Sequence, residues 1–432
     1  MKKKTICVQG IGFVGAAMIS VLADAKNNEN KYLYNLIGVD LKNKIGQERI
    51  DKINLGLFPF ETKDKKIKKS LSLARKQKRL FATTDTQYFS KADIIIIDTH
   101  LDLKAFNKSI NKSNFVRGII EVFKFIKPKT LLLIESTIPP GMTEKVLLPE
   151  IKKILKKRKL KLEDIFLAHS YERVMPGLNY FNSIKEYWRV YAGINKTSAD
   201  NCEKFLKTFI NTKKYELTRL ENIRSSELAK ILENTYRAVT ISLMDEWSKF
   251  ADSINIDLYQ VSDAIRKRTT HSNIRYPGLG VGGYCLTKDP KFAEISAKKI
   301  FKLKNMPFPI SNYSVRINNK MPDHAFSIIK KNYGNKLKEI SVLIMGLSYL
   351  ADVSDTRFSP SEILYNKLCN NVKSIFLHDP LVSYWKEKEI NIPNDLPDFS
   401  KINLVVLAVK HKSYTTMNYL PILKKNKNLV IF

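Results

Sequence analysis

Cysteine is scarce in this sequence, with four in 432 residues. Cys7, Cys202, Cys285 and Cys369 lie far apart, and none is part of a Cys-x-x-Cys pair. This spacing argues against a disulfide framework and against a zinc site, so we expect no bound metal. The same cysteine usage suits a reducing compartment, and we expect the protein to act in the cytoplasm.

Long hydrophobic runs are absent as well. No segment approaches the ~18 uncharged apolar residues that a membrane-spanning helix needs. The N-terminus runs from three lysines directly into a short strand pattern, which is not the pattern of a signal peptide. We therefore predict no association with a membrane.

Acidic residues are outnumbered, with 42 Asp and Glu against 74 Lys and Arg and a net charge of +32. Such a charge can indicate binding to nucleic acid or to an anionic membrane surface. Here the lysines are scattered over predicted helices, for example at 65–69, 152–161 and 298–304, without interleaved aromatic residues. A solvated basic surface fits this pattern better, and we predict no nucleic-acid partner. A small substrate that carries phosphate remains compatible with the charge.

The residues that are present indicate a globular chain of two or three domains, with 44% hydrophobic content. Short apolar runs alternate with helical patterns, as is typical of strands buried on both faces of a doubly wound parallel sheet. In the first half these runs are 5–9, 36–40, 93–97, 130–134 and 165–169, and in the last third they are 341–346, 374–379, 403–409 and 428–432.

One long segment, Ser226–Phe250, contains neither Gly nor Pro and repeats its apolar residues every three or four positions, which predicts a helix buried on one side. The predicted fold class is α/β, with two Rossmann-like doubly wound domains joined by this long central helix and a helical middle domain. The expected boundaries are 1–205 for the first Rossmann-like domain, 206–325 for the helical domain and 326–432 for the second Rossmann-like domain.

The first strand is followed by Gly10-Ile-Gly12-Phe13-Val14-Gly15 and then by a helical pattern over 16–25. A strand, a GxGxxG loop and a helix form the context of a dinucleotide site, in which the helix N-terminus faces the diphosphate. The second strand ends in Asp40, which can bind a ribose 2′-hydroxyl and disfavour a 2′-phosphate. We therefore expect NAD, rather than NADP, as the cofactor.

A second glycine-rich loop, Tyr276–Pro290, has four glycines between 278 and 283 and then Cys285. Glycines let the backbone approach a ligand closely. The thiol is a candidate nucleophile with Lys288 and Asp289 nearby in sequence, or else an inert cysteine beside a tight turn.

Other candidate residues follow strands or share a helix face. Thr137 lies after the strand at 130–134, and Glu172 and Arg173 lie after the strand at 165–169, where ligands of such sheets bind. Lys230 and Asn234 are four apart on the long helix, so they offer either a cation and an amide to an oxyanion or an ordinary polar face.

These motifs, in this order and over essentially the whole chain, resemble those of the UDP-glucose/UDP-N-acetylhexosamine/GDP-mannose 6-dehydrogenase family. The similar segments are Gly10-x-Gly12-x-x-Gly15, Ile53-Asn-Leu-Gly56-x-x-Pro59-x-Glu61, Thr83-Thr-Asp85, Ser136-Thr137-x-Pro-Pro-Gly141, Glu172-Arg173-Val-x-Pro-Gly177, Lys230-x-x-x-Asn234-x-x-Arg237, Gly280-Val-Gly-Gly-x-Cys285 and Asp355-x-Arg357-x-Ser359-Pro360.

The resemblance implies a four-electron oxidation of a sugar C6 hydroxyl to a carboxylate, with two NAD⁺ and with Cys285 forming a thiohemiacetal and then a thioester. It implies that Lys230 and Asn234 stabilise oxyanions, that Thr137 and Glu172 orient or activate water, and that Asp289 assists the cysteine. The implied cofactor contacts are Gly10, Gly12, Phe13, Val14, Gly15, Asp40 and Thr137. The implied contacts to a nucleotide-sugar substrate are Glu172, Arg173, Lys230, Asn234, Gly282 and Arg357. It also implies a homodimer through the long helix.

The sequence departs from the family pattern at three places. Tyr171 stands where the family usually has proline, Asp98-Thr-His100-Leu101 replaces Val-Pro-Thr-Pro, and Leu350 replaces a lysine. The first two changes bear on the cofactor or sugar pocket, and the third bears on contacts to the nucleotide. The segment that begins at Glu172 is similar to the N-acetylhexosamine branch, whereas Cys285-Leu-Thr-Lys288-Asp289 is more similar to the UDP-glucose branch; we favour a UDP-N-acetylhexosamine.

Three other functions remain open at the level of sequence. A two-electron dehydrogenase of the β-hydroxyacid type also joins a Rossmann domain to helices, but it needs neither Cys285 nor a second α/β unit. The other two are a basic nucleotide- or nucleic-acid-binding protein without activity and a catalytically degenerate member of the family.

Overall fold

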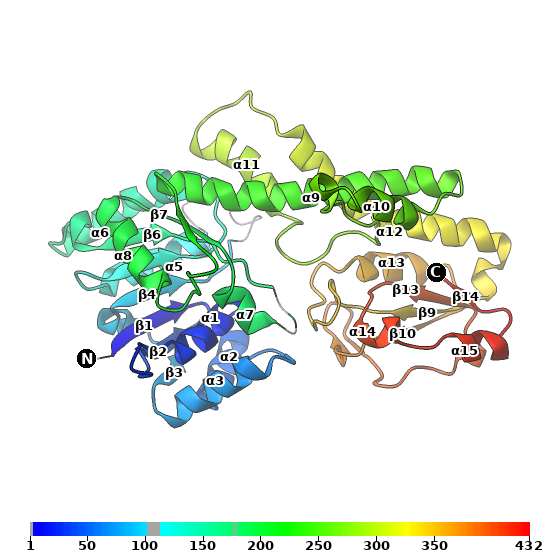
Figure 1. The fold of residues 1–432 in the computed structure, drawn as a ribbon, viewed down its shortest axis with the longest axis horizontal. Coiled ribbons are helices and arrows are strands. Elements are labelled where there is room, and N and C mark those ends of the chain that lie inside the picture. The colour runs from blue at the N-terminus through cyan, green and yellow to red at the C-terminus, as the bar shows by residue number, and fades with distance from the viewer. Residues whose placement is uncertain (1–2, 102–112, 176, 178) are drawn as a thin grey trace. The chain divides into compact units, whose positions relative to one another are not determined.

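The computed structural model describes residues 3–101, 113–175, 177 and 179–432 (Figure 1). It divides into two compact units. The N-terminal unit comprises residues 1–231 and 292–306, and the C-terminal unit comprises residues 232–291 and 307–432. The chain therefore leaves the first unit within a helix, returns to it once and leaves it again.

The N-terminal unit is built on one eight-stranded sheet in the order β3-β2-β1-β4-β5-β6-β7-β8. The strands are β1 (Lys4–Gln9), β2 (Tyr34–Val39), β3 (Leu80–Thr83), β4 (Ile94–Ile97), β5 (Leu131–Ile134), β6 (Phe166–His169), β7 (Arg189–Gly193) and β8 (Leu217–Arg219). The first six run parallel, and β7 runs antiparallel to β6. The strand order reverses between β1 and β4, which creates a crevice at their carboxyl ends.

Helices cover both faces of this sheet because its strands are apolar on both sides (Figure 1). One face packs against α1 (Phe13–Asp24), α2 (Lys44–Asn54), α3 (Lys65–Lys76), α7 (Tyr180–Lys185) and α8 (Lys196–Leu206). The other packs against α5 (Asn114–Phe125), α6 (Leu148–Lys157) and α11 (Phe292–Ile295). Asp64 determines where two of these helices begin. Its buried carboxylate caps α3 and also accepts the Phe181 amide at the start of α7 at 2.8 Å.

The C-terminal unit combines helices with a second, smaller parallel sheet in the order β10-β9-β13-β14. Its strands are β9 (Ser341–Met345), β10 (Ser374–His378), β13 (Leu404–Leu407) and β14 (Val430–Ile431), with a separate hairpin of β11 (Tyr384–Trp385) and β12 (Ile390–Asn391). Its helices are α10 (Leu258–Arg266), α12 (Pro309–Tyr333), α13 (Pro360–Leu368), α14 (Lys412–Thr415) and α15 (Leu420–Lys425). Again the order reverses beside the first strand, here between β9 and β13, so this sheet has its own crevice.

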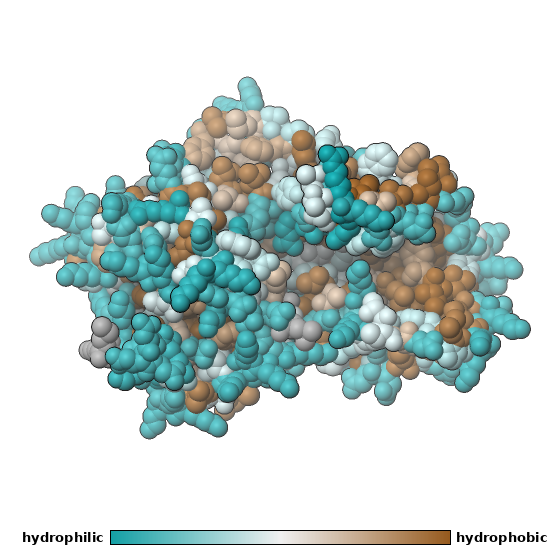
Figure 2. Space-filling view, in the orientation of Figure 1, coloured by the Kyte–Doolittle hydropathy of each residue, from teal (hydrophilic) through white to brown (hydrophobic). Residues whose placement is uncertain are grey.

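The longest helix, α9 (Ile223–Ser253), begins in the N-terminal unit and continues into the C-terminal one. It leaves large apolar side chains exposed, among them Leu232, Tyr236, Trp247 and Phe250. Figure 2 shows hydrophobic, brown surface over the end of α9 that lies at the right of Figure 1.

The fold class predicted from sequence is confirmed. The predicted strands match the observed ones to within one or two residues at most ends, and the long helix extends about one turn further at each end than its Gly- and Pro-free core. Helix α1 begins at Phe13, three residues before the predicted start, because the last glycine of the loop is already helical. Across the described residues, no helix combines the length and the apolar character needed to cross a bilayer.

A glycine at the second crevice provides a test of this fold. Gly346 has φ of +100°, and a Cβ added there would lie 2.4 Å from Cβ of Val409. We expect Gly346→Ala to lower the free energy of unfolding by roughly 2–5 kcal/mol, because backbone strain and overpacking act together. Chemical denaturation measures this loss.

Gly278→Ala is the matched control in the same unit, since an added Cβ there meets no atom within 4 Å and the residue is not among those with positive φ. It should change the free energy of unfolding by no more than about 0.5 kcal/mol. Equal losses in the two variants would contradict the conformation assigned to Gly346.

Candidate functional site

The glycine loop after β1 turns sharply and opens at the N-terminus of α1. Gly10 has φ of +93°, and a Cβ added there would lie 2.9 Å from the carbonyl oxygen of Asp98. A Cβ at Gly15 would lie 2.0 Å from the carbonyl oxygen of Gly10, whereas one at Gly12 would meet nothing within 4 Å. The loop thus needs Gly10 and Gly15 for its shape, and Gly12 leaves an open approach for a dinucleotide diphosphate.

Asp40, directly after β2, faces this loop. Its Oδ2 accepts the Ile11 amide at 3.1 Å, and its Oδ1 accepts the Leu41 amide at 2.8 Å. A carboxylate has about four acceptor positions, so these bonds leave capacity for a ribose hydroxyl. The loop and Asp40 together fit NAD, whose chemistry when bound is to accept hydride.

Phe13 and Val14, two further predicted cofactor contacts, begin α1. The Phe13 ring stacks on Phe60 with centroids 3.8 Å apart, and Val14 packs against the core of the unit. We therefore expect their contribution to come through the backbone of the helix start rather than through their side chains.

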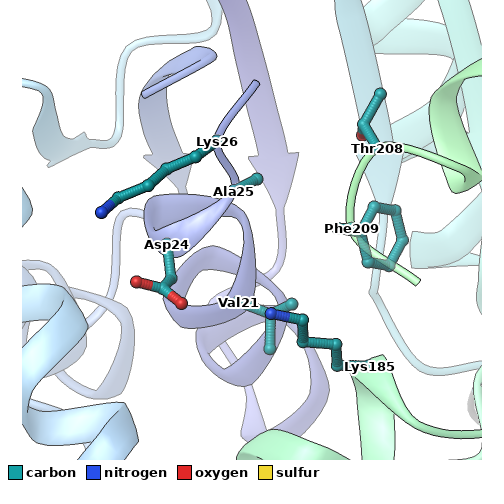
Figure 3. Close-up of a pocket in the computed structure, with 7 residues that line it drawn as sticks. All are labelled: Val21, Asp24, Ala25, Lys26, Lys185, Thr208 and Phe209. Carbon is teal, nitrogen blue, oxygen red and sulfur yellow. The ribbon is translucent and has the colours of Figure 1, made fainter. Parts of the chain in front are cut away.

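A cavity of about 240 Å³ lies at the opposite end of α1 (Figure 3). It is lined by Val21, Asp24, Ala25, Lys26, Lys185, Thr208 and Phe209. Since α1 has 12 residues, about 18 Å of helix separates this cavity from the glycine loop. The cavity is therefore not the cofactor site.

The loop after β5 is tied to the end of β4. Ser136 donates its hydroxyl to the carbonyl oxygens of Ile97 and Thr99, and its amide donates to Ile97 as well. Thr137, the next residue, is half-buried. The predicted Thr137 therefore lies at the carboxyl edge of the sheet, as expected.

Glu172 and Lys230 come together in the N-terminal unit. The Lys230 ammonium donates to the carbonyl oxygen of Glu172 at 2.9 Å, and its distance to the Glu172 carboxylate is 4.0 Å. Lys230 is 6% exposed, so this contact holds a nearly buried cation beside a carboxylate. The structure thus brings these two predicted residues together.

Tyr171, one of the departures from the family pattern, is buried at the centre of this group. The Lys230 ammonium lies 5.2 Å from its ring centroid, and the Arg173 guanidinium lies 5.5 Å from it. Arg173 also donates to the Tyr171 hydroxyl at 3.2 Å and to the Trp188 carbonyl oxygen at 2.6 Å. The ring therefore positions both predicted cations through cation–π contacts; Pro176 of the same motif lies outside the described residues.

Behind these residues lies a group of buried charges that the sequence did not predict. The Arg189 guanidinium of β7 donates to the Glu135 carboxylate, and both side chains are almost fully buried. Burial lowers the pKa of His169 to about 3, so this imidazole is neutral, with Nδ1 2.8 Å from the Ser226 hydroxyl. Asp98, directly after β4, adds a further carboxyl whose oxygens are shielded from solvent.

In the C-terminal unit, the cysteine loop is anchored to α9. The carbonyl oxygen of Cys285 accepts the Lys288 and Asp289 amides at 3.2 and 2.9 Å, which forms a turn. Asp289 is fully buried and accepts the Asn234 side-chain amide at 2.7 Å as well as the Lys288 ammonium. Cys285 itself is exposed. Asn234, Asp289 and Cys285 are thus brought together through a single buried carboxylate.

The same loop packs against the loop that follows β9. A Cβ at Gly282 would lie 2.6 Å from Cβ of Tyr349, and the Gly283 amide donates to the Arg357 carbonyl oxygen at 3.1 Å. Burial, with the nearby Asp355 carboxylate, raises the pKa of Tyr349 to about 12. Arg357 is held by two hydrogen bonds to Asp355, at 2.8 and 2.6 Å. The glycines therefore serve close backbone packing within this unit.

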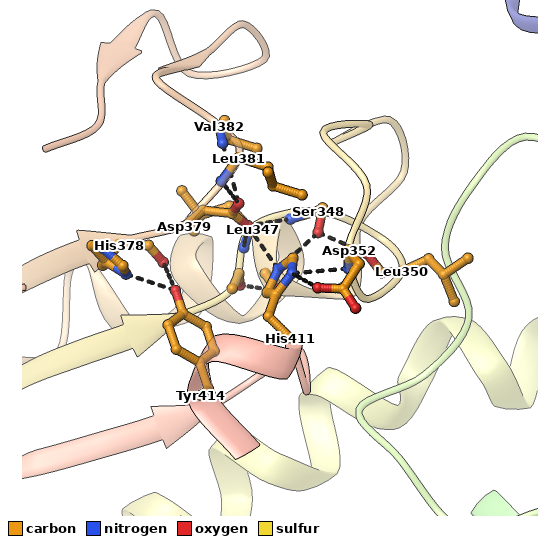
Figure 4. A network of polar contacts seen from close by, with 12 residues as sticks. Leu347, Ser348, Leu350, Asp352, His378, Asp379, Leu381, Val382, His411 and Tyr414 are labelled. Carbon is orange, nitrogen blue, oxygen red and sulfur yellow. Dashed lines mark hydrogen bonds and ion pairs between the residues drawn. The ribbon is translucent and has the colours of Figure 1, made fainter. Parts of the chain in front are cut away.

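The loop after β9 is shaped by a buried carboxylate, Asp379 (Figure 4). Asp379 accepts the amides of Leu347 and Ser348 at 2.8 and 3.2 Å, and His411 Nε2 lies 3.2 Å from it. Burial opposes ionisation of Asp379, but hydrogen bonds from His411 and the backbone amides hold its pKa below the usual value. The Asp352 amide donates to His411 Nδ1 at 2.9 Å, so the ring proton is on Nε2. This network fixes the loop at the second crevice.

The predicted site residues are thus divided between the two units. The N-terminal unit holds Gly10, Gly12, Phe13, Val14, Gly15, Asp40, Thr137, Glu172, Arg173 and Lys230, and the C-terminal unit holds Asn234, Gly282, Cys285, Asp289 and Arg357. The segment that begins at Asp98 was noted from sequence as a departure that bears on the cofactor or sugar pocket, whereas Glu135, Arg189, Asp379 and His411 were missed. Asp379 directly follows a strand, as Asp40 does, and that signal could have identified it.

Within the described part of the chain, no three His, Cys, Asp or Glu side chains are grouped so that they could hold a metal ion.

The comparisons with known proteins agree with the two crevices. The chain matches the UDP-glucose/GDP-mannose dehydrogenase family in three segments: the NAD binding domain over residues 4–210, the central domain over 224–320 and the UDP binding domain over 343–432. It is 29% identical to a UDP-N-acetyl-D-mannosamine dehydrogenase of Methanococcus vannielii, over 100% of this chain and 92% of the relative. It is 30% identical to the protein of the same name of Methanocaldococcus jannaschii, over 87% of this chain and 79% of the relative.

Solved structures show the same similarity. The structure of the UDP-D-ManNAc dehydrogenase of Pyrococcus horikoshii superposes with a TM-score of 0.80 at 26% identity, covering 99% of this chain and 94% of that one.

These matches, with a dinucleotide loop in one unit and a second nucleotide-type crevice in the other, define an NAD-dependent nucleotide-sugar dehydrogenase, which oxidises its substrate to a uronic acid. The chain belongs to the UDP-glucose/GDP-mannose dehydrogenase family.

Asp289 gives a prediction for the geometry of the cysteine loop. Asp289→Ala should lower the free energy of unfolding by about 3–5 kcal/mol, because the buried Lys288 ammonium and the Asn234 amide both lose their acceptor. Chemical denaturation measures this loss. Asp252→Ala, which removes an exposed carboxylate that pairs with His324 in the same unit, should cost less than about 1 kcal/mol. A similar loss in both variants would show that Asp289 does not anchor the loop.

Proposed function

We propose that this enzyme oxidises the C6 hydroxyl of a UDP-N-acetylhexosamine to the carboxylate in two steps, with Cys285 holding the intermediate covalently. The observation that carries the proposal is the fixed position of the exposed Cys285 beside the buried Asn234–Asp289 pair. The choice of an N-acetylated sugar is supported by the names of its relatives, which include an NDP-N-acetyl-D-galactosaminuronic acid dehydrogenase of Ralstonia nicotianae at 25% identity over 96% of this chain and 92% of the relative.

In this proposal, the first oxidation converts the alcohol to an aldehyde. The Cys285 thiolate attacks the aldehyde carbon to give a thiohemiacetal, and loss of a second hydride from that carbon gives a thioester. Water then cleaves the thioester, releasing the carboxylate and the thiol. Because the sulfur holds the intermediate, the aldehyde cannot leave after one oxidation.

The neighbouring residues have separate tasks. Lys230 and Asn234 stabilise the oxyanion that forms at each addition, with the Lys230 cation positioned by the Glu172 carbonyl oxygen and the Tyr171 ring. Glu172 and Thr137 orient or activate the hydrolytic water. Asp289 positions Asn234 and the Cys285 turn, and Arg357 and Gly282 contribute to substrate binding at the loop after β9.

We also propose that the chain has three domains, 1–205, 206–325 and 326–432, and the three family matches support this division. The cytoplasm is proposed as the compartment because the four cysteines are widely spaced and the cofactor is NAD.

The experiment that tests the chemistry is incubation with NAD⁺ and a panel of UDP- and GDP-sugars, with NADH yield and product mass read together. We expect two NADH per uronic acid formed, and highest activity with UDP-N-acetylhexosamines. Cys285→Ser should block completion of the second oxidation and lower uronic acid formation roughly a thousandfold or more, because a hydroxyl is a weaker nucleophile than a thiolate. Binding of NAD⁺ should survive.

Cys369→Ser is the matched control, since Cys369 is also exposed and lies in the same unit. It should behave as the wild type does. A yield of one NADH per sugar in the wild type would favour a two-electron dehydrogenase, and wild-type turnover by Cys285→Ser would rule out the covalent step.

We also propose that the enzyme is a homodimer formed through α9. Its exposed apolar side chains recur on one side of the helix at Leu232, Tyr236, Leu243, Trp247 and Phe250, each at least half exposed. A contiguous apolar face of this kind is typical of a protein–protein interface. A second copy of the chain is the partner that the family resemblance implies.

Analytical ultracentrifugation tests the dimer. Trp247→Glu combined with Phe250→Glu should raise the dimer dissociation constant roughly a hundredfold or more, because buried aromatic residues dominate interfaces. Leu420→Glu, an equally exposed apolar position on α15, should leave it unchanged. A wild type that sediments as a monomer at micromolar concentration would contradict the proposal.

A further inference from the structure

Asp98 occupies the crevice where the order of the N-terminal sheet reverses. It follows β4, which pairs with β1 in the register Gln9 to Ile97, and the Asp98 amide donates to the Gln9 carbonyl oxygen at 2.9 Å. Its backbone and Cβ form the surface under the glycine loop, since a Cβ at Gly15 would lie 3.2 Å from the Asp98 Cβ. In parallel α/β sheets this crevice is where the ligand binds.

Neither oxygen of the Asp98 carboxyl is exposed to solvent, and neither has a hydrogen-bond partner among the described residues. A buried carboxylate without hydrogen bonds or a partner cation is strongly disfavoured relative to the neutral acid. The site therefore favours the protonated form of Asp98 on geometry alone.

The charged groups around Asp98 reinforce this preference. The loop after β5 contributes Glu135, the segment after β6 contributes Glu172 with Lys230 beside it, and β7 contributes Arg189. The guanidinium of Arg189 acts in the opposite direction on the pKa of Asp98, but it is bonded to Glu135. Burial and the repulsion from Glu135 and Glu172 raise the pKa of Asp98 well above its usual value.

Two other titratable groups near the glycine loop supply no positive charge that would offset the repulsion at Asp98. His169 on β6 is neutral and bonded to Ser226, and Asp40 after β2 is held by backbone amides. The β1–α1 loop itself carries no charged side chain. A dinucleotide bound there would bring two negative charges on its diphosphate to the surface that Asp98 underlies.

We propose that Asp98 acts as a proton-linked determinant of cofactor binding: the dinucleotide binds when Asp98 is protonated, so binding takes up a proton and weakens as pH rises. The sign follows from linkage. The diphosphate makes ionisation of Asp98 still less favourable, so the bound state holds more protons than the free state. Deprotonation of Asp98 at higher pH then competes with binding.

The test is isothermal titration calorimetry with ADP-ribose, which carries the diphosphate without the positive charge of a nicotinamide. Titrations in two buffers of different ionisation enthalpy at each pH give the number of protons taken up per ligand bound. In the wild-type enzyme we expect little uptake at pH values at which Asp98 is already protonated without ligand. Uptake should approach one proton per ligand once the pH exceeds the pKa of Asp98 in the free enzyme, and in that range the dissociation constant should rise by up to about tenfold per pH unit. In Asp98→Asn, which is neutral and of the same shape, uptake should vanish and affinity should become independent of pH.

Asp93→Asn is the matched control at the other end of the same strand. Asp93 pairs with Lys127 at 2.8 Å and accepts the Thr5 amide; its removal should leave the proton uptake on binding as in the wild type. NAD⁺ should show the same dependence on Asp98 as ADP-ribose.

If Asp98→Asn folds poorly, a second variant and a second measurement test the same proposal. Asp98→Val should also abolish uptake. In thermal melts of the ligand-free enzyme, stability associated with the raised pKa of Asp98 is lost as pH rises, so either variant should gain stability over the wild type at alkaline pH. Absence of uptake in the wild type at every pH up to the alkaline limit of stability, or uptake that persists in both variants, would overturn the proposal.

Discussion

The buried carboxylate of Asp289 is the constraint on which the candidate chemistry depends. It lies one turn after Cys285 and is bonded to Asn234 on α9, so it links the Cys285 turn to an amide on a rigid helix. Loops that carry four glycines in six positions lose much entropy on ordering. Here that cost is offset by a fully buried hydrogen-bonded charge and by close packing against the loop after β9.

In both sheets, a carboxylate accepts backbone amides near the point where the strand order reverses. In the N-terminal unit, Asp40 receives backbone amides from Ile11 and Leu41, and in the C-terminal unit Asp379 receives them from Leu347 and Ser348. In each case a carboxylate after the neighbouring strand holds the loop after the first strand. The crevice is thus shaped by electrostatics within the protein before any ligand arrives, which is the preorganisation that binding and catalysis require.

Sequence was sufficient for the elements whose signal is local. Continuous apolar runs located most core strands, glycine spacing located the dinucleotide loop, and the Gly- and Pro-free stretch located α9. Strand β7 was missed because it begins with Arg189, a charge that only its distant partner Glu135 allows to be buried.

The remainder of the candidate site depends on contacts between residues far apart in the chain. The contact of Tyr171 with Lys230 spans almost sixty positions, and that of Asp379 with His411 spans 32. No local pattern encodes such contacts. The surroundings of Asp98 are of the same kind, since the glycine loop that its backbone and Cβ adjoin lies some ninety residues earlier in the chain.

The return of residues 292–306 to the N-terminal unit has a consequence for how the protein is made. Phe292 is fully buried there in the same core as Ile231, and Phe301 packs where a side chain on Gly141 would have to be. A nascent chain emerging from the ribosome cannot close this core when its eight-stranded sheet has been synthesised, because the last piece arrives only after the cysteine loop. The N-terminal unit therefore keeps part of its apolar surface open until residues 232–291 of the C-terminal unit, and then residues 292–306, have been translated. During this interval the polypeptide would depend most on chaperones.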